Sequence, residues 1–317
     1  MRLSTGARDC IRGKVSRRDP RDCRHGPSPR RISPFWETPE KQALCDASMV
    51  EKSQRNSAGL ILHGETRMSQ QAPEKKRRIT LNAKPEPIAM DTAATAVMVI
   101  DMQNDFGAKG GLFDRAGLDI SMIQRAVAPT AKVLAAARSA GIKVIYLNMG
   151  FRPDLSDLGA PDSPNRVRHL MFGAGKNLRA PDGTESRILI RDTWNTAVLP
   201  ELEPRDGEIA IYKHRFSGFY ETDLDAVLKK SGVRSLIVTG CTTSVCVEST
   251  VRDAMFRDYR CILLGDCMGE PIGNDLPRSN HEASLLVIQT LFGWVSDSRE
   301  FQRALEAEAI ATARSSA

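Results

Sequence analysis

The feature that most constrains this chain is the alternation, from about residue 92 onward, of short apolar runs with longer segments of helical periodicity. Strand-length runs separated by helix-length connections favour a parallel sheet covered by helices on both faces. The sequence therefore predicts an α/β fold with a doubly wound, mainly parallel sheet. The strands are expected at residues 95–101, 143–148, 208–213, 235–240 and 260–266.

The connections between these strands include several predicted helices. Residues 123–140 carry apolar side chains at spacings of three and four and are followed by Gly141, and residues 224–231 are followed by Gly232. A glycine just beyond the last helical residue is a common C-terminal signal. Residues 151–195 are rich in Pro, Gly, Asp and Arg and too long for a bare connection, which predicts a substrate loop or lid. Further helices are expected at about residues 245–257, 280–292 and 298–309.

Residues 1–89 differ from the rest of the chain in composition. They have no sustained apolar period and are dominated by Pro, Arg, Ser and Lys, so we expect a largely disordered, basic N-terminal extension before a folded domain at residues 90–317. The formal net charge is +6, but the arginines crowd into the first stretch, so no nucleic-acid partner is expected. The KKRR run at residues 75–78 is interpreted as solvated surface, with a nuclear signal as the alternative. Met68 and Met90 are alternative starts of a shorter protein.

The cysteines and the apolar runs indicate in which cellular compartment the protein is expected. Seven cysteines, an odd number scattered along the chain, predict reduced thiols and a cytoplasmic location rather than disulfides. The apolar runs are too short to cross a bilayer, and the N-terminus lacks the pattern of a secretory signal. No membrane association is therefore expected.

Three chemically active side chains come at or just after the ends of predicted strands. Asp101 lies in VIDMQNDF, Lys213 in IYKHRFSGF, and Cys246 in CTTSVCVEST, at the start of a predicted helix. Ligands of open parallel sheets bind outside the carboxyl ends of the strands. A helix N-terminus and a neighbouring lysine both lower a thiol pKa, which predicts Cys246 as a nucleophile. Asp101 can then shuttle the proton while Lys213 holds the charges in register, and the backbone N–H groups of Thr242 and Cys246 can stabilise an oxyanion.

Other interpretations of these residues stay open. An Asp after a strand often caps a turn, a Lys there is usually solvated, and a free Cys is often part of the core. Only the joint placement at three strand ends favours catalysis. A zinc module built from two loosely spaced cysteine pairs and a Cys–His dyad are weaker alternatives, and a family member acting as a binding or scaffold protein is another. The residues concerned are Cys241, Cys246, Cys261 and Cys267 for zinc, and His214 and His281 for the dyad.

The motifs around these residues resemble those of the isochorismatase-like cysteine hydrolases. They are DMQND, KHRFSGF, the G-x-T-T-x-x-C turn with VCVEST, and FGWVSD, and the resemblance covers about residues 95–305. Within that superfamily the chain is most similar to ureidoacrylate amidohydrolases, which share SPN at Ser163, K-x-R-aromatic-SGF and VCVESTVRD in that order. The resemblance implies a doubly wound parallel sheet and a homo-oligomer. It also implies a triad of Asp101, Lys213 and Cys246, an oxyanion hole at Thr242 and Cys246, and a cis peptide between Cys241 and Thr242.

The sequence departs from the ureidoacrylate pattern where substrate would be bound. Phe216 replaces a tyrosine, and Met149, Gly150 and Phe151 replace an N-G-W string. A ureido or amide small molecule is expected, with biuret, triuret or an N-carbamoyl amino acid as alternatives to ureidoacrylate. No metal is expected, because NMGFRPD lacks the histidine of metal-binding relatives, and no cofactor motif is present. Candidate substrate contacts are Asn148, Phe151, Trp194 and Phe216.

Overall fold

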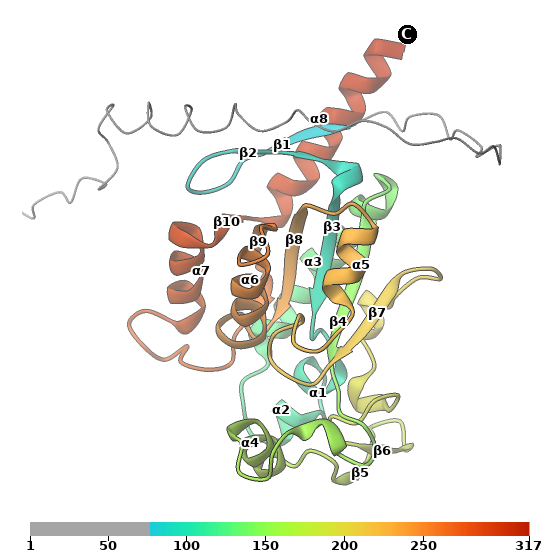
Figure 1. The fold of residues 1–317 in the computed structure, drawn as a ribbon, viewed down its shortest axis with the longest axis vertical. Helices are drawn as coiled ribbons and strands as arrows, with labels where there is room; N and C mark the ends of the chain where they lie inside the picture. The colour runs from blue at the N-terminus through green and yellow to red at the C-terminus, as the bar shows by residue number, and fades with distance from the viewer. Residues whose placement is uncertain (1–76, 317) are drawn as a thin grey trace, which may run out of the picture. The chain divides into compact units, whose positions relative to one another are not determined.

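The computed structural model describes residues 77–316 of the chain (Figure 1). Its centre is a six-stranded sheet in which all neighbouring strands are parallel. Helices lie on both faces, which confirms the predicted doubly wound α/β fold. The order across the sheet is β10 (Gly293–Ser296), β9 (Arg260–Gly269), β8 (Ser235–Cys241), β3 (Thr95–Ile100), β4 (Lys143–Met149) and β7 (Ile209–Lys213).

The alternation of side chains along β3 explains why both faces need cover. All six of its residues are buried, since successive side chains of a strand point to opposite faces. Val97 and Val99 belong to one hydrophobic core, and Met98 and Ile100 belong to the other. The first core is closed by α3 (Ser121–Ser139) and α8 (Ser298–Ser316), and the second by α5 (Leu224–Lys230), α6 (Glu248–Met255) and α7 (Asn280–Leu291) (Figure 1).

Most of the expected elements are present, one of them is divided, and β10 is among the additions. β10 was not expected, because four residues are too few to display alternation. The helix expected at residues 245–257 is divided into a π-helix, η6 (Thr243–Val247), and α6. Among the helices described between residues 77 and 316, none combines the length and apolar character that a membrane crossing needs. The remaining short elements of the body are η2 (Thr92–Ala94), α1 (Asn104–Gly107), α2 (Leu112–Arg115) and η5 (Pro200–Leu202).

The expected domain boundary at residue 89 falls inside an ordered hairpin. β1 (Arg78–Leu81) pairs antiparallel with β2 (Ile88–Asp91), and buried Ile79 and Leu81 join the core closed by α3 and α8. Each strand turns only two side chains inward, which is too short a pattern to recognise in a basic, proline-containing sequence. The folded part therefore begins before residue 89, and the expectation for residues 1–76 concerns a segment outside the described residues.

The lid segment, residues 151–195, has secondary structure of its own. α4 (Pro164–Phe172) begins after Ser163, whose Oγ accepts a hydrogen bond from the backbone N–H of Arg166 at 3.2 Å. It ends at Gly173, where a φ of +99° suits a residue without a Cβ. The other elements are η3 (Ser156–Leu158), β5 (Asn177–Arg179), β6 (Glu185–Arg187) and η4 (Trp194–Thr196).

Asp105 fastens this lid segment to the body. Its Oδ1 accepts hydrogen bonds from the Asn195 amide at 2.5 Å and the Leu112 backbone N–H at 3.1 Å, and its Oδ2 accepts one from the Leu189 N–H at 2.8 Å. Burial raises the pKa of Asp105 to about 6, and these three donors oppose the rise. The lid is thus tied down at residues 189 and 195 by one buried carboxylate.

We expect the stability of the protein relative to its Asp105→Asn variant to fall as the pH rises from 4 to 7. The folded pKa of about 6 lies above the ordinary value of 3.8, so the contribution of Asp105 is fully present below pH 3.8 and is lost as the pH rises through 6. Asparagine has no proton to lose. Urea unfolding of both proteins across this range should show a difference that shifts by about 2–3 kcal/mol. Parallel pH curves would contradict the raised pKa.

Candidate active site

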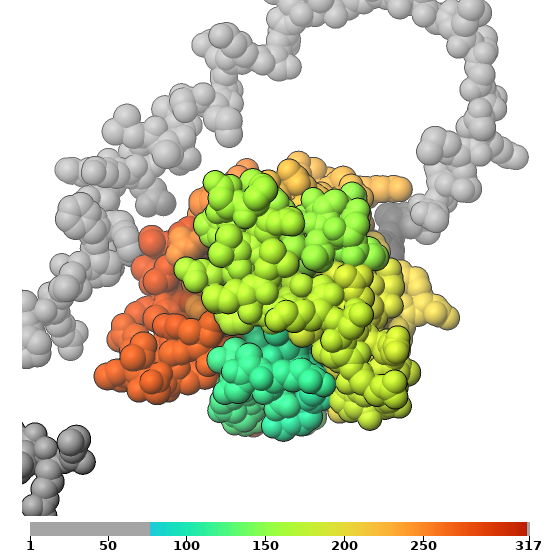
Figure 2. All heavy atoms as spheres, turned by 90° about the horizontal axis from the view of Figure 1, so that it is seen from below, coloured from blue at the N-terminus to red at the C-terminus, as the bar shows by residue number. Residues whose placement is uncertain are grey.

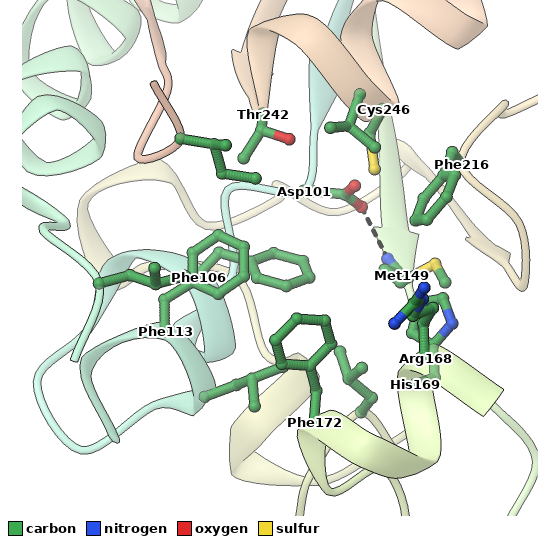
Figure 3. Close-up of a pocket in the computed structure, with 15 residues that line it drawn as sticks. Asp101, Phe106, Phe113, Met149, Arg168, His169, Phe172, Phe216, Thr242 and Cys246 are labelled. Carbon is green, nitrogen blue, oxygen red and sulfur yellow. Dashed lines mark hydrogen bonds between the residues drawn. The ribbon is translucent and has the colours of Figure 1, made fainter. Parts of the chain in front are cut away.

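A cavity of about 180 Å³ lies at the carboxyl ends of the central strands. Figure 2 looks onto this face, where the lid segment (green to yellow) lies beside α1 and α2 (teal). The lining is mostly aromatic and aliphatic, with Phe106, Phe113, Phe172 and Phe216 among its members. Its polar members are Asp101, Arg168, His169, Thr242 and Cys246 (Figure 3).

Asp101 and Lys213 form a buried ion pair beside this cavity. Asp101 follows β3 with a φ of +54°, a left-handed conformation that is uncommon outside glycine, and Lys213 is the last residue of β7. Lys213 Nζ lies 2.7 Å from Asp101 Oδ2, and both residues are fully buried. Asp101 Oδ1 accepts a hydrogen bond from the backbone N–H of Met149 at 2.8 Å. The carboxylate is therefore held by the end of β4 as well as by the lysine.

Cys246 is placed by the turn between β8 and the π-helix η6. Gly240 has a φ of +121°, and a Cβ there would come within 2.0 Å of the Ile100 carbonyl oxygen, so only glycine lets β8 approach β3 this closely. The pairing of β8 with β9 shifts register at the same point. The expected cis peptide between Cys241 and Thr242 is confirmed. The Cys246 thiol is directed toward Asp101 (Figure 3), and the charges of Asp101 and Lys213 both act on it.

The turn is also held by the buried carboxylate of Glu270. Its Oε2 accepts a hydrogen bond from the Ser244 backbone N–H at 2.7 Å, and its Oε1 accepts one from the Ile272 N–H at 3.0 Å. Thr243 Oγ1 lies 2.9 Å from His281 Nδ1. These contacts fix the residues that precede the cysteine.

The pKa of the Cys246 thiol is raised, whereas the sequence predicted a lowered value. Burial is the main cause and the negative charge of Asp101 adds to it, while Lys213 opposes both. Burial also raises the pKa of Asp101 against the pull of Lys213. For Lys213, burial favours the neutral amine, but the charges of Asp101 and Cys246 outweigh it and raise the pKa. The resting site therefore combines a Lys213–Asp101 ion pair with a neutral thiol.

The structure brings only some of the expected site residues together. Phe216 and Thr242 line the cavity with Asp101 and Cys246, and Lys213 lies directly behind Asp101. The other three expected substrate contacts do not line it. The side chain of Asn148 is turned away from the cavity, since its amide donates a hydrogen bond to the Thr196 carbonyl at 3.4 Å. Phe151 is fully buried, and its ring centroid lies 5.0 Å from that of His169. Trp194 lies in η4, where its carbonyl accepts from Asn104.

Several lining residues were not expected. Arg168, His169 and Phe172 come from α4, a helix inside the segment expected to be a substrate loop or lid. Ser163 followed by Pro164 is an N-cap signal that could have revealed this helix. The inward faces of α1 and α2 carry too few residues to show a period.

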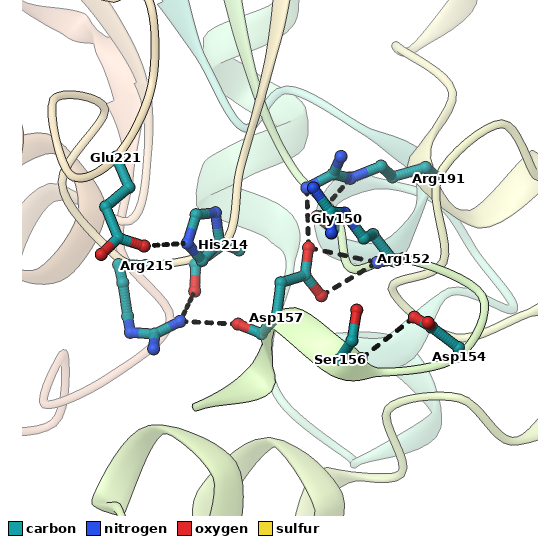
Figure 4. Close-up of polar contacts among 9 residues, drawn as sticks. All are labelled: Gly150, Arg152, Asp154, Ser156, Asp157, Arg191, His214, Arg215 and Glu221. Carbon is teal, nitrogen blue, oxygen red and sulfur yellow. Dashed lines mark hydrogen bonds and ion pairs between the residues drawn. The ribbon is translucent and has the colours of Figure 1, made fainter. Parts of the chain in front are cut away.

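The histidine and zinc alternatives find no support in the geometry. His214 Nε2 lies 3.3 Å from Glu221 Oε2, in a separate polar cluster around Asp157 that also holds Arg191 and Arg215 (Figure 4). His281 contacts Thr243 rather than Cys246. Within residues 77–316, no group of three or more His, Cys, Asp or Glu side chains is arranged as metal ligands.

Comparison with known proteins adds family information to this geometry. Residues 95–300 match the isochorismatase domain. A protein named ureidoacrylate amidohydrolase RutB from Methylorubrum extorquens is 42% identical over 230 residues, which cover 73% of this chain and 90% of that protein. A protein of the same name from Yersinia enterocolitica is 40% identical over 70% of this chain and 93% of its own length.

A solved structure agrees with these sequence matches. A cysteine hydrolase from Pseudomonas syringae pv. phaseolicola superposes with a TM-score of 0.59 and 30% identity, covering 74% of this chain and all of that one (100%). The domain match alone spans more than half of the chain, from residue 95 to residue 300. The chain therefore belongs to the isochorismatase family.

Proposed function

We propose that this protein is a cysteine-dependent amidohydrolase that cleaves a C–N bond of a ureido or amide small molecule, with ureidoacrylate as the leading substrate. One observation carries the proposal: a buried Asp101–Lys213 ion pair, 2.7 Å between Oδ2 and Nζ, beside the Cys246 thiol at a cavity. The names of the bacterial relatives support this reaction and this substrate.

In the first half-reaction, Asp101 takes the proton of Cys246 while the sulfur attacks the substrate carbonyl carbon. This transfer moves a negative charge from carboxylate to sulfur and leaves the net charge of the buried group unchanged. Lys213 can stay paired through the step, because its positive charge acts on both Asp101 and Cys246. A raised thiol pKa is therefore compatible with catalysis, since no free thiolate has to exist before substrate binds.

The carbonyl oxygen gains the negative charge as the tetrahedral intermediate forms. The N–H groups of Thr242 and Cys246 are proposed to receive it. Among the hydrogen bonds of residues 77–316, the Thr242 N–H has no protein acceptor, which fits this role. The C–N bond then breaks, and Asp101 returns the proton to the leaving nitrogen, which departs as ammonia or an amine.

The second half-reaction hydrolyses the thioester. Water loses a proton to Asp101 as its oxygen attacks the carbonyl, and the sulfur leaves and is reprotonated as the thiol. From a ureido substrate the product is a carbamate, which breaks down to carbon dioxide and ammonia or an amine.

The position and charge of Arg168 favour a substrate with a negative charge. Its side chain lines the cavity from α4 and has no ion pair among the described residues, unlike Arg191, which pairs with Asp157. A guanidinium of this kind matches a carboxylate in charge and shape. Ureidoacrylate and N-carbamoyl amino acids carry that group, whereas biuret and triuret do not.

We also propose a homo-oligomer in the cytoplasm. The four cysteines described are free and buried, as in a reducing compartment. α7 exposes Leu286 and Leu291 at 44% and 68%, and Phe256, the residue that follows neighbouring α6, is 67% exposed. Large apolar side chains grouped in this way are typical of an interface, here with a second copy of the chain.

Replacing Cys246 by Ala should lower turnover of ureidoacrylate by about 10³-fold or more, because the nucleophile is lost. Asp101→Asn should be comparably severe, since an amide cannot accept the thiol proton. Ammonia release measures both, and Cys261→Ala, at a buried cysteine away from the cavity, should keep the wild-type rate. Undiminished turnover by Cys246→Ala would refute the mechanism, whereas a wild-type protein without activity would favour a binding protein.

Arg168→Met should raise the KM for ureidoacrylate by roughly 10-fold and leave kcat almost unchanged, because a charge-assisted contact with the carboxylate is lost. Activity on neutral biuret, if present, should not change. Arg152→Met removes a lid cation outside this cavity and serves as the control. An equal loss in both variants would exclude a specific role for Arg168.

Light scattering should find the wild-type protein as an oligomer and Leu291→Lys shifted toward the monomer, since a buried charge would oppose association. Ile310→Lys, which adds the same charge at an exposed apolar position of α8, should behave as wild type. A monomeric wild-type protein would rule out the proposed assembly.

A further inference from the structure

His169 is a buried histidine that the mechanism above does not use. It lies on α4 and lines the cavity beside Met149, whose N–H holds Asp101 (Figure 3). Its ring is packed between two aromatic rings, 5.0 Å from that of Phe151 and 5.6 Å from that of Phe216. The imidazole thus has a fixed position in the wall of the site.

The hydrogen-bonding state of this ring follows from its contacts. Nδ1 lies 2.6 Å from the backbone carbonyl oxygen of Asn165, which can only accept, so Nδ1 carries the hydrogen. Burial lowers the pKa of His169, and the positive charges of Lys213 and Arg215 also lower it. The imidazole is therefore neutral at pH 7, and Nε2 has a lone pair. Among residues 77–316, no hydrogen-bond donor pairs with it.

The other polar groups of the cavity leave a specific need for an acceptor. The carboxylate of Asp101 is already paired with Lys213 and with the Met149 N–H, and Arg168 can only donate hydrogen bonds. The Thr242 hydroxyl can donate or accept a hydrogen bond, but Nε2 of His169 can only accept one. A carbonyl that bears nitrogen brings N–H groups into a mostly apolar cavity, where an unpaired N–H weakens binding. The wall of the cavity thus contains one fixed acceptor whose partner must come from the substrate.

We propose that His169 determines specificity by accepting, through Nε2, an N–H on a nitrogen bonded to the attacked carbonyl carbon. The residue thereby selects ureido and carbamoyl compounds over acyl compounds that lack this N–H. This role rests on the proposed attack by Cys246, but it does not require ureidoacrylate to be the substrate.

Two esters of nearly equal shape test this selection. p-Nitrophenyl carbamate has an amino group where p-nitrophenyl acetate has a methyl group, and both release p-nitrophenolate when Cys246 is acylated. His169→Phe keeps an aromatic ring between Phe151 and Phe216 and removes the acceptor. We expect this variant to lose about 10- to 100-fold in kcat/KM for the carbamate, with the acetate within about threefold of wild type.

His169→Gln provides the matched control, since its amide oxygen can reach the position of Nε2 and should restore most of the preference. His169→Leu is a second apolar variant should His169→Phe fold poorly, and thermal unfolding checks all three. An unchanged ratio of the two esters in the apolar variants would overturn the role of His169. Absence of nitrophenolate release by the wild-type protein from either ester would overturn it as well, because the role requires a carbonyl on Cys246.

The ester measurements test the role of His169 separately from the assignment of ureidoacrylate as the substrate. A protein that is silent on ureidoacrylate but loses carbamate preference in His169→Phe would retain the role of His169 and lose the substrate assignment. A protein that hydrolyses ureidoacrylate and keeps its ester ratio in His169→Phe would retain the substrate and lose the role.

Discussion

The ion pair between Asp101 and Lys213 is the interaction on which the rest of the site depends. Two opposite charges with no solvent contact are tolerated only where each has further partners, and removal of one partner of such a pair typically costs 3–5 kcal/mol. Here the Met149 N–H donates to Asp101, and Lys213 Nζ donates to the Arg215 carbonyl oxygen at 3.4 Å. β3 and β7 both flank β4, so the strand order itself brings the two charges to the same end of the sheet. Cys246 must also be placed next to this pair. The turn at Gly240 and the hydrogen bonds of Glu270 give the cysteine that position.

Much of the fold could be predicted from the sequence, because buried parallel strands such as TAVMVI are continuous apolar runs and the helices α3 and α5 are each followed by a glycine. Apart from α4, the elements that escaped prediction are those whose pattern is too short. β10 has four residues, and β1 and β2 bury two side chains each. The division of the nucleophile helix into η6 and α6 has no signature in side-chain periodicity, since it depends on the backbone geometry of the preceding turn.

The candidate triad could be located from strand ends and motif resemblance, but its electrostatics could not. The expectation of a lowered Cys246 pKa counted the lysine and the helix terminus and left out burial and the charge of Asp101, which dominate. The cavity wall was missed for a different reason. Asn148 and Phe151 lie near a strand end in sequence, yet their side chains point to Thr196 and to the back of His169, which only the folded lid determines.

The organisation of the lid has an evolutionary consequence. Nine residues of α4, bounded by the Ser163 cap and Gly173, contribute Arg168, His169 and Phe172 to the cavity, while Asp101, Lys213 and Cys246 come from the sheet and the turn that follows it. Reactivity and selectivity are thus encoded in separate stretches of the gene. Substitutions within one short helix can redirect the enzyme to a different small molecule while the reactive centre is inherited unaltered, so a single scaffold of this kind can supply many divergent hydrolases.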